Sequence, residues 1–220
     1  MEKRDFIGKE DFTFDEFAEL VRVLRAPDGC PWDRAQTHRS IRNNFIEETY
    51  EAVEGIDRDD PSILREELGD VMLQVLLHAA MEEESGNFSI GDVINDICRK
   101  LVFRHPHVFA DRLANNEEEA LDSWDERKKK EKGQKDALQS VASVSRALPS
   151  LMRAQKLYKK AKKGGLIPPR DGDDSANVSS VGQALFDLCA LCSENGLEAE
   201  QILYDFNEKF IADLAKNDEK

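Results

Sequence analysis

The chain has 220 residues and a formal net charge of -14, and 40% of its residues are hydrophobic and 35% charged. This composition predicts a folded globular protein rather than a disordered one. The acidic balance argues against a nucleic acid as the main partner, because binding to a phosphate backbone depends on concentrated lysine and arginine, but it is compatible with a small anionic substrate held through metal ions.

The N-terminal segment, residues 1–12, mixes charged residues with single apolar ones and has no signal-peptide pattern. The most apolar segment, residues 71–81, is interrupted by Gln74 and His78 and is too short to cross a bilayer. Four cysteines in a chain without an export signal indicate free thiols in a reducing compartment. We therefore expect a cytoplasmic protein with no membrane partner.

Helical signals follow one another through the first half of the chain. Thr13 and Glu16 form a capping box, and Asp60 followed by Pro61 is a second start signal, with an N-cap residue and a proline at the first helical position. A tight segment around Trp32 separates the first two elements. The expected helices cover residues 14–24, 37–56, 61–84 and 90–104.

The second half begins with a strongly charged stretch, residues 116–135, which we interpret as a solvated helix leading into a linker. Further helices are expected at residues 149–163, 176–194 and 197–215, the last two after a break rich in Gly, Pro and Asp. No segment alternates with the period of two that marks a strand. The sequence therefore predicts an all-α helical bundle.

A faint internal repeat suggests two modules, residues 1–135 and 136–220. Arg34-Ala35-Gln36 recurs as Arg153-Ala154-Gln155, and Leu68-Gly69-Asp70 aligns with Val181-Gly182-Gln183. The later copy lacks the carboxylates of the first. We interpret it as a degenerate second module that serves as scaffold or dimer surface.

Acidic side chains gather on the second and third predicted helices. Glu48 and Glu51 lie one turn apart on the second helix, beside its apolar face. The third helix is apolar nearly all round, so we expect it to be buried nearly all round. Its one polar stripe contains Glu67, Asp70, Gln74 and His78. Because the two helices are expected to pack together, these carboxylates should converge.

The repulsion within such a cluster is large. Two carboxylates about 4 Å apart repel by about 4 kcal/mol at an effective dielectric of 20, and four of them by on the order of 20 kcal/mol, more than the roughly 5–15 kcal/mol stability of a domain. Protons or cations must relieve it. Oxygen ligands without a set of His and Cys favour Mg²⁺, with Mn²⁺ as a substitute. The alternative is that the acids face solvent or pair with Arg42, Arg58 and Arg65.

Three further side chains could contact a phosphorylated substrate. Lys100 and Arg104 lie one turn apart on the fourth predicted helix and could hold phosphate oxygens, or could be ordinary cations near a helix C-terminus. Trp32 could stack on a base or anchor the core.

Several motifs together resemble the MazG-type nucleoside triphosphate pyrophosphohydrolases. The resemblance runs from about Phe14 to Trp124 and resumes at residues 148–156. The motifs are Cys30-Pro31-Trp32-Asp33, Gln36-Thr37, Glu47-Glu48-x-x-Glu51, Glu67-Leu68-Gly69-Asp70 and Arg104-His105-Pro106-His107-Val108-Phe109-Ala110-Asp111.

This resemblance implies an all-α bundle completed by homodimerisation, Mg²⁺ dependence, and hydrolysis of a nucleoside triphosphate to the monophosphate and pyrophosphate. Glu48, Glu51, Glu67 and Asp70 would be the metal ligands, Glu47 would orient or deprotonate the attacking water, and Lys100 and Arg104 would bind the phosphates. The second module keeps Lys209 but lacks the acidic set, so the first half should carry the activity.

The sequence thus indicates a hydrolase that controls the nucleotide pool or removes damaged nucleotides, with activity in the first module. Two alternatives stay open. The bundle could belong to a non-catalytic regulator that binds nucleotides or a protein partner. It could also be a pyrophosphohydrolase of another nucleotide-like metabolite.

Overall fold

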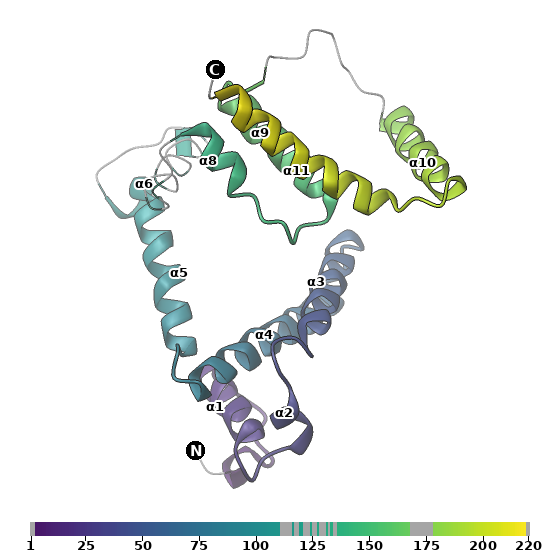
Figure 1. The fold of residues 1–220 in the computed structure, drawn as a ribbon. Coiled ribbons are helices and arrows are strands. Elements are labelled where there is room, and N and C mark those ends of the chain that lie inside the picture. Colours follow the sequence, from purple (N-terminus) through teal and green to yellow (C-terminus); the bar gives the residue numbers. More distant parts are fainter. Residues whose placement is uncertain are drawn as a thin grey trace. The chain divides into compact units, whose positions relative to one another are not determined.

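The computed structural model contains helices and turns, and no β-strand, in the residues that it describes, which are 3–110, 116, 119, 120, 124, 127, 131, 133, 136–167 and 178–218 (Figure 1). The predicted all-α class is confirmed. Two compact units divide the chain, Met1–Phe103 and Arg104–Lys220, and each is described by itself. The helices of the first are η1 (Lys3–Phe6), α1 (Phe14–Arg25), α2 (Pro31–Ala35), α3 (Arg42–Asp57), α4 (Pro61–Glu84) and α5 (Ile90–Arg104), whose last residue opens the second unit.

The start of α1 has the predicted capping box. The Thr13 hydroxyl accepts a bond from the backbone N–H of Glu16 at 3.3 Å, and the Glu16 carboxylate accepts one from the Thr13 N–H at 2.8 Å. Lys9 pairs with the same carboxylate. Hydrogen bonds from Lys9 and Thr13 lower the pKa of Glu16 from 4.5 to about 2. Two orphan N–H groups of the helix terminus are satisfied in this way.

Helices α3 and α4 form a closely packed pair joined by a short turn (Figure 1). Asp60 caps α4 by accepting bonds from the N–H groups of Ser62 and Ile63 at 2.9 and 3.3 Å, as the sequence predicted. The backbones of the two helices approach closely at Gly55. A Cβ atom placed on Gly55 would lie 2.8 Å from the backbone nitrogen of Leu64, so only glycine fits without a shift.

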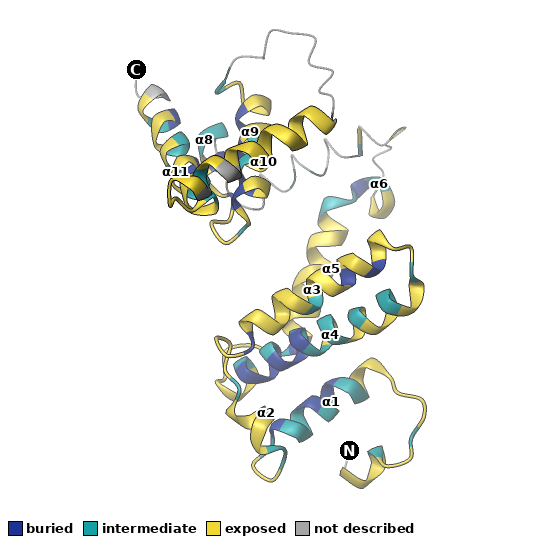
Figure 2. Cartoon of the chain, turned by 90° about the vertical axis from the view of Figure 1, so that its right-hand side faces the viewer, coloured by how far each residue is buried: buried dark blue, intermediate teal, exposed yellow. Residues whose placement is uncertain are grey.

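The core of the first unit lies where α1 packs against the C-terminal half of α4. The buried residues of α4 all lie from position 74 onward, which Figure 2 shows in dark blue. This burial is the main stabilising contribution in the unit, at about 25 cal/mol per Å² of apolar surface. The buried hydrophobic residues of this core cluster are Ala18, Val21, Ile41, Leu76, Leu77, Ala79, Ala80, Met81 and Ile90.

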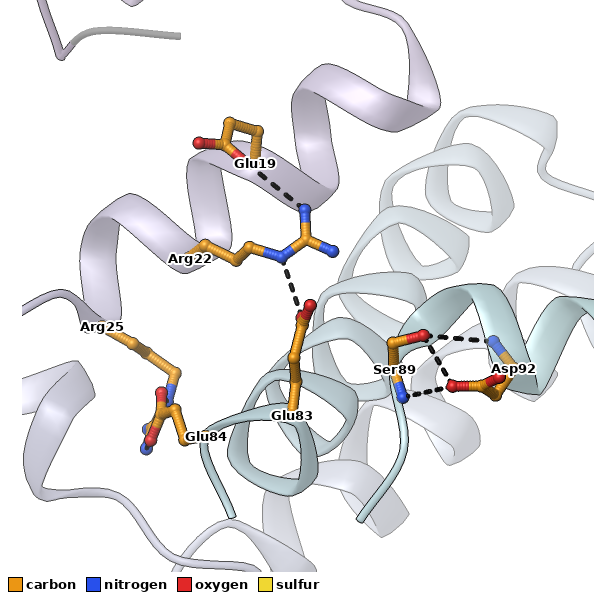
Figure 3. Close-up of polar contacts among 7 residues, drawn as sticks. All are labelled: Glu19, Arg22, Arg25, Glu83, Glu84, Ser89 and Asp92. Atoms are coloured by element: carbon orange, nitrogen blue, oxygen red, sulfur yellow. Dashed lines mark hydrogen bonds and ion pairs between the residues drawn. The ribbon is translucent and has the colours of Figure 1, made fainter. Parts of the chain in front are cut away.

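Two arginines of α1 fasten the end of α4 (Figure 3). Arg22 donates from Nε to Glu83 at 2.9 Å, and Arg25 donates from Nε to Glu84 at 2.7 Å. The Arg25 side chain, only 5% exposed, also donates to the backbone oxygen of Asp33 in α2 at 2.5 Å. A single buried guanidinium thus joins α1, α2 and α4.

Two predictions about the first unit need correction. Helix α3 begins at Arg42 rather than at residue 37, because Thr37 and Ser40 bond to each other's backbone N–H groups and form a turn instead of a helical start. Helix α4 is not buried nearly all round. Leu68 is 49% exposed and Met72 is 41% exposed, since no described element of the first unit covers their side of the helix.

The second unit contains α6 (Pro106–Phe109), α8 (Ala137–Ala142), α9 (Ser150–Lys163), α10 (Val178–Glu194) and α11 (Ala199–Asp218). Helices α8, α9 and α11 enclose a core that includes Val141, Leu157 and Leu214. The fully buried Arg153 pairs with Glu208 at 2.7 Å. The predicted module boundary at residues 135 and 136 stays a prediction, because most residues just before it lie outside the described ones.

Among the helices that the structure describes, none combines the length and the apolar content that crossing a lipid bilayer requires.

Candidate functional site

Three carboxylates from two helices meet at one place in the first unit. Glu48 comes from α3, and Glu67 and Asp70 come from α4. One oxygen of each lies within 4.8 Å of the others, and in the described part of the chain this is the one group of three or more acidic, His or Cys side chains close enough to share an ion. All three side chains are partly buried. The predicted convergence of the two helices is therefore observed for these residues.

The pKa values of two of these carboxyl groups reflect burial and the repulsion between the acids of the cluster. Burial, followed by the charges of Asp70 and Glu51, raises the pKa of Glu48 above its ordinary value. Burial, followed by the charge of Glu51, likewise raises the pKa of Glu67, and a hydrogen bond with Glu51 adds to the effect. Glu51 thus joins the cluster through Glu67. A bound cation would reverse both shifts.

The predicted guanidinium partners do not neutralise the acids. Arg58 pairs with Glu54 of its own helix, and the described residues contain no ion pair between the cluster and Arg42 or Arg65. What remains is a set of carboxylate oxygens without nitrogen or sulfur donors. Such a set fits a hard divalent cation that keeps several of its waters, as Mg²⁺ does.

None of the other predicted site residues belongs to this group of three acids. Glu47 is exposed next to Glu48, and Lys100 is exposed on α5. Trp32 is 62% exposed on α2, so it is not a core anchor in this chain. Arg104 belongs to the second unit, where it donates to Glu131 at 2.9 Å and stacks over Trp124 at 5.1 Å from the ring centroid. The roles predicted for these residues stay predictions.

Two features near the site were missed from the sequence. Gly55 allows the close approach of α3 and α4. The sequence feature that could have predicted this approach is a small residue one turn after Glu51, on the face toward the next helix. His38 lies against His78, which the sequence analysis placed on the polar stripe of α4. The two histidines are separated by 40 residues, and no local pattern pairs them.

Comparisons with known proteins agree with this site. A family model described as the MazG nucleotide pyrophosphohydrolase domain matches residues 36–109, which contain all the clustered acids. A nucleoside triphosphate pyrophosphohydrolase of Escherichia coli is 37% identical over 219 residues, covering 89% of this chain and 83% of that protein. A nucleoside triphosphate pyrophosphohydrolase/pyrophosphatase MazG of Thermotoga maritima is 40% identical over 223 residues, covering 94% and 86%.

A third relative, the uncharacterized protein YabN of Bacillus subtilis, is 49% identical over 146 residues, but the match spans only 30% of its length and 66% of this chain. The relatives from E. coli and T. maritima match along most of both chains, and the family model falls on the helices that carry the acidic cluster. The chain therefore belongs to the MazG nucleotide pyrophosphohydrolase family.

Proposed function

We propose that the first module, residues 1–135, hydrolyses nucleoside triphosphates to nucleoside monophosphates and pyrophosphate with the help of Mg²⁺. The observation that supports this most is the meeting of Glu48, Glu67 and Asp70, to which no arginine in the described part of the chain is ion-paired. The names of the relatives from E. coli and T. maritima point to the same reaction. Mn²⁺ is the expected substitute.

The roles of the residues follow from their chemistry. Glu48, Glu67 and Asp70 would hold Mg²⁺, and Glu51 would complete the set from its place beside Glu67. When bound, the ion supplies positive charge for the triphosphate and lowers the pKa of a coordinated water. Glu47, exposed beside Glu48, would orient or deprotonate the water that attacks the α-phosphorus.

Pyrophosphate leaves as the water oxygen bonds to the α-phosphorus, and the proton of that water passes to the carboxylate of Glu47. Lys100 and Arg104 would hold the phosphate oxygens, Lys100 as a point charge and Arg104 as a fork. For Arg104 this requires release from Glu131, its partner at 2.9 Å. Trp32, exposed on α2, would offer an aromatic face to the substrate.

A homodimer is the proposed assembly. Apolar side chains of α3, α4 and α5 remain exposed in the first unit, and a second copy would cover them. Leu68 and Met72 are exposed on α4, and α5 carries an apolar stripe of which only Ile90 is buried. The exposed members of that stripe are Ile94, Ile97 and Leu101. Residues 136–220 would serve as a degenerate scaffold module, and the enzyme would act on the cytoplasmic nucleotide pool.

The test is a panel of ordinary and damaged nucleoside triphosphates, with and without Mg²⁺, scored for pyrophosphate against orthophosphate. Glu48→Gln and Asp70→Asn should abolish turnover while circular dichroism shows an unchanged helical content. Glu54→Gln is the matched control, because Glu54 lies on the same helix and pairs with Arg58 instead of joining the cluster. Near-normal pyrophosphate release from both acidic variants would defeat the assignment. Nucleotide binding without any hydrolysis would favour a regulator instead.

A further inference from the structure

Two histidines and a glutamate form a hydrogen-bonded chain beside α4. The Nδ1 atoms of His38 and His78 are 2.7 Å apart, and the Nε2 atom of His38 lies 2.8 Å from Glu82 Oε1. The two rings are almost parallel, at 4°, and their centroids are 5.0 Å apart. With the nitrogens so close, the rings meet edge to edge and share a hydrogen bond rather than stacking face to face.

A bridging metal ion does not fit between these two nitrogens. Two Zn–N bonds of about 2.0–2.1 Å at a tetrahedral angle place the nitrogens roughly 3.3 Å apart, whereas they are 2.7 Å apart here. A proton between them fits. The three side chains therefore form a row of hydrogen bonds, from Glu82 to His38 and from His38 to His78. We call this row the relay.

The relay fixes which nitrogen of each neutral ring carries the proton. An ionised Glu82 can only accept, so His38 donates from Nε2 and its Nδ1 becomes an acceptor. His78 must then donate from Nδ1. Its Nε2 is left with a lone pair, and within the described residues no side chain or backbone group donates to it. His78 thus presents a hydrogen-bond acceptor.

The position of His78 relates this acceptor to the acidic cluster. Asp70, Gln74 and His78 follow one another at one-turn intervals on α4. Eight residues of helix place His78 about 12 Å beyond Asp70, close to the length of a nucleoside monophosphate. Between them, the Oε1 atom of Gln74 is buried without a hydrogen-bond donor in the described structure. A ribose hydroxyl could supply that donor.

Phe45 completes the surroundings of His78. It lies one turn before Glu48 on α3, its ring centroid is 5.6 Å from that of His78, and 36% of the residue is exposed. An exposed aromatic face beside a hydrogen-bond acceptor is the combination that binds a base, since every base offers a flat face for stacking.

We propose that Phe45 and His78 form the nucleobase end of the substrate site, where His78 Nε2 accepts a hydrogen bond from an N–H group of the base. Glu82 and His38 are positioning residues that hold His78 in the accepting tautomer. This inference rests on the proposed function, whose triphosphate end lies at Asp70. The base subsite adds the orientation of the substrate along α4, with the triphosphate at Asp70 and the base at His78.

The first test is nuclear magnetic resonance of the ¹⁵N-histidine-labelled full chain at pH 8, which reports the tautomer of each ring. His38 should carry its proton on Nε2 and His78 on Nδ1, and Glu82→Leu should release both preferences. A wild-type His78 that carries its proton on Nε2 would overturn the inference.

The second test compares His78→Leu with His78→Gln, since Gln keeps an acceptor near the position of Nε2. For the best triphosphate of the panel, His78→Leu should raise KM about tenfold with little change in kcat, and His78→Gln should recover part of the loss. With ribose 5-triphosphate, which has no base, the two variants should match the wild type. An unchanged KM, or an equal rise with ribose 5-triphosphate, would overturn the inference.

The two levels of the proposal fail in different ways. If the wild type releases no pyrophosphate from any triphosphate, the proposed function is wrong and the base subsite falls with it, whatever the tautomers are. If the wild type is active and only the base-dependent KM effect is missing, the proposed function stands and the subsite alone is wrong.

Discussion

Arg25 (Figure 3) holds both carboxylate oxygens of Glu84, with Nε at 2.7 Å and Nη2 at 2.9 Å. Its Nη1 donates to the Asp33 carbonyl. The guanidinium is buried and the carboxylate is about half exposed. One side chain therefore links the end of α1 to the end of α4 and to the segment that carries Trp32. The packing of three elements depends on it.

Replacing Arg25 should destabilise the first unit more than replacing its neighbour. Arg25→Leu removes several charge-assisted hydrogen bonds and should cost about 2 kcal/mol in the free energy of unfolding, discounted for the exposure of Glu84. Arg22→Leu removes an exposed pair with Glu83 and should cost less than about 1 kcal/mol. Urea denaturation of both variants measures the difference. Equal losses would show that the buried fork adds nothing.

The capping carboxylate of Glu16 should make the folding stability of the first unit sensitive to acid. Its folded pKa of about 2 lies below the ordinary 4.5, so its contribution to stability is present above pH 4.5 and is lost as the pH falls toward 2. In Glu16→Gln the side chain can still accept from Thr13 but does not titrate. Melting temperatures from pH 5.5 to 2 should fall less steeply in this variant than in the wild type. Parallel curves would contradict the lowered pKa.

In the metal-free cluster, the effect of pH on folding stability should have the opposite sign to that of Glu16. Because the folded pKa of Glu48 is raised, its contribution to stability is present below the ordinary value and is lost as the pH rises through the folded value. In EDTA, Glu48→Gln should therefore be more stable than the wild type at neutral pH. Mg²⁺ should raise the melting temperature of the wild type and leave the variant unchanged. A wild type that does not respond to Mg²⁺ would argue against the metal site.

The exposed stripe of α5 should mediate the proposed homodimer. Ile97→Lys places a charge in the middle of the stripe and should shift the mass measured by light scattering toward the monomer. Asn95→Lys adds the same charge to the same helix at an exposed polar position and is the control. A dimer that survives Ile97→Lys would move the interface elsewhere.

Local signals allowed much of the fold to be predicted from the sequence. The capping box of Thr13 and the Asp60-Pro61 start fixed two helix beginnings, since both depend on bonds within three residues. The start of α3 was wrong because Thr37 and Ser40 satisfy the backbone in a turn. The short α8 was missed, although Asp136 caps it as a recognisable N-cap.

The site could be predicted only in part. Helical spacing brought Glu67 and Asp70 onto one stripe, and the apolar faces indicated which helix would face it. The pairing of His38 with His78 could not be predicted, because it depends on how the segment before α3 folds back. The burial of Leu68 was overestimated because periodicity marks apolar surface without telling whether the same chain covers it.

The lack of a side chain at Gly55 has a consequence for ion selectivity. The gap between α3 and α4 determines how far apart carboxylates on the two rods can sit, and a methyl group there would meet the backbone of Leu64. Forcing α3 and α4 apart should increase the distances between the carboxylate oxygens of the proposed metal site. Its preference should then shift from a small cation toward a larger one such as Ca²⁺. An engineer wishing to change the ionic radius that the proposed metal site accepts should therefore begin at Gly55, which is not one of the proposed ligands.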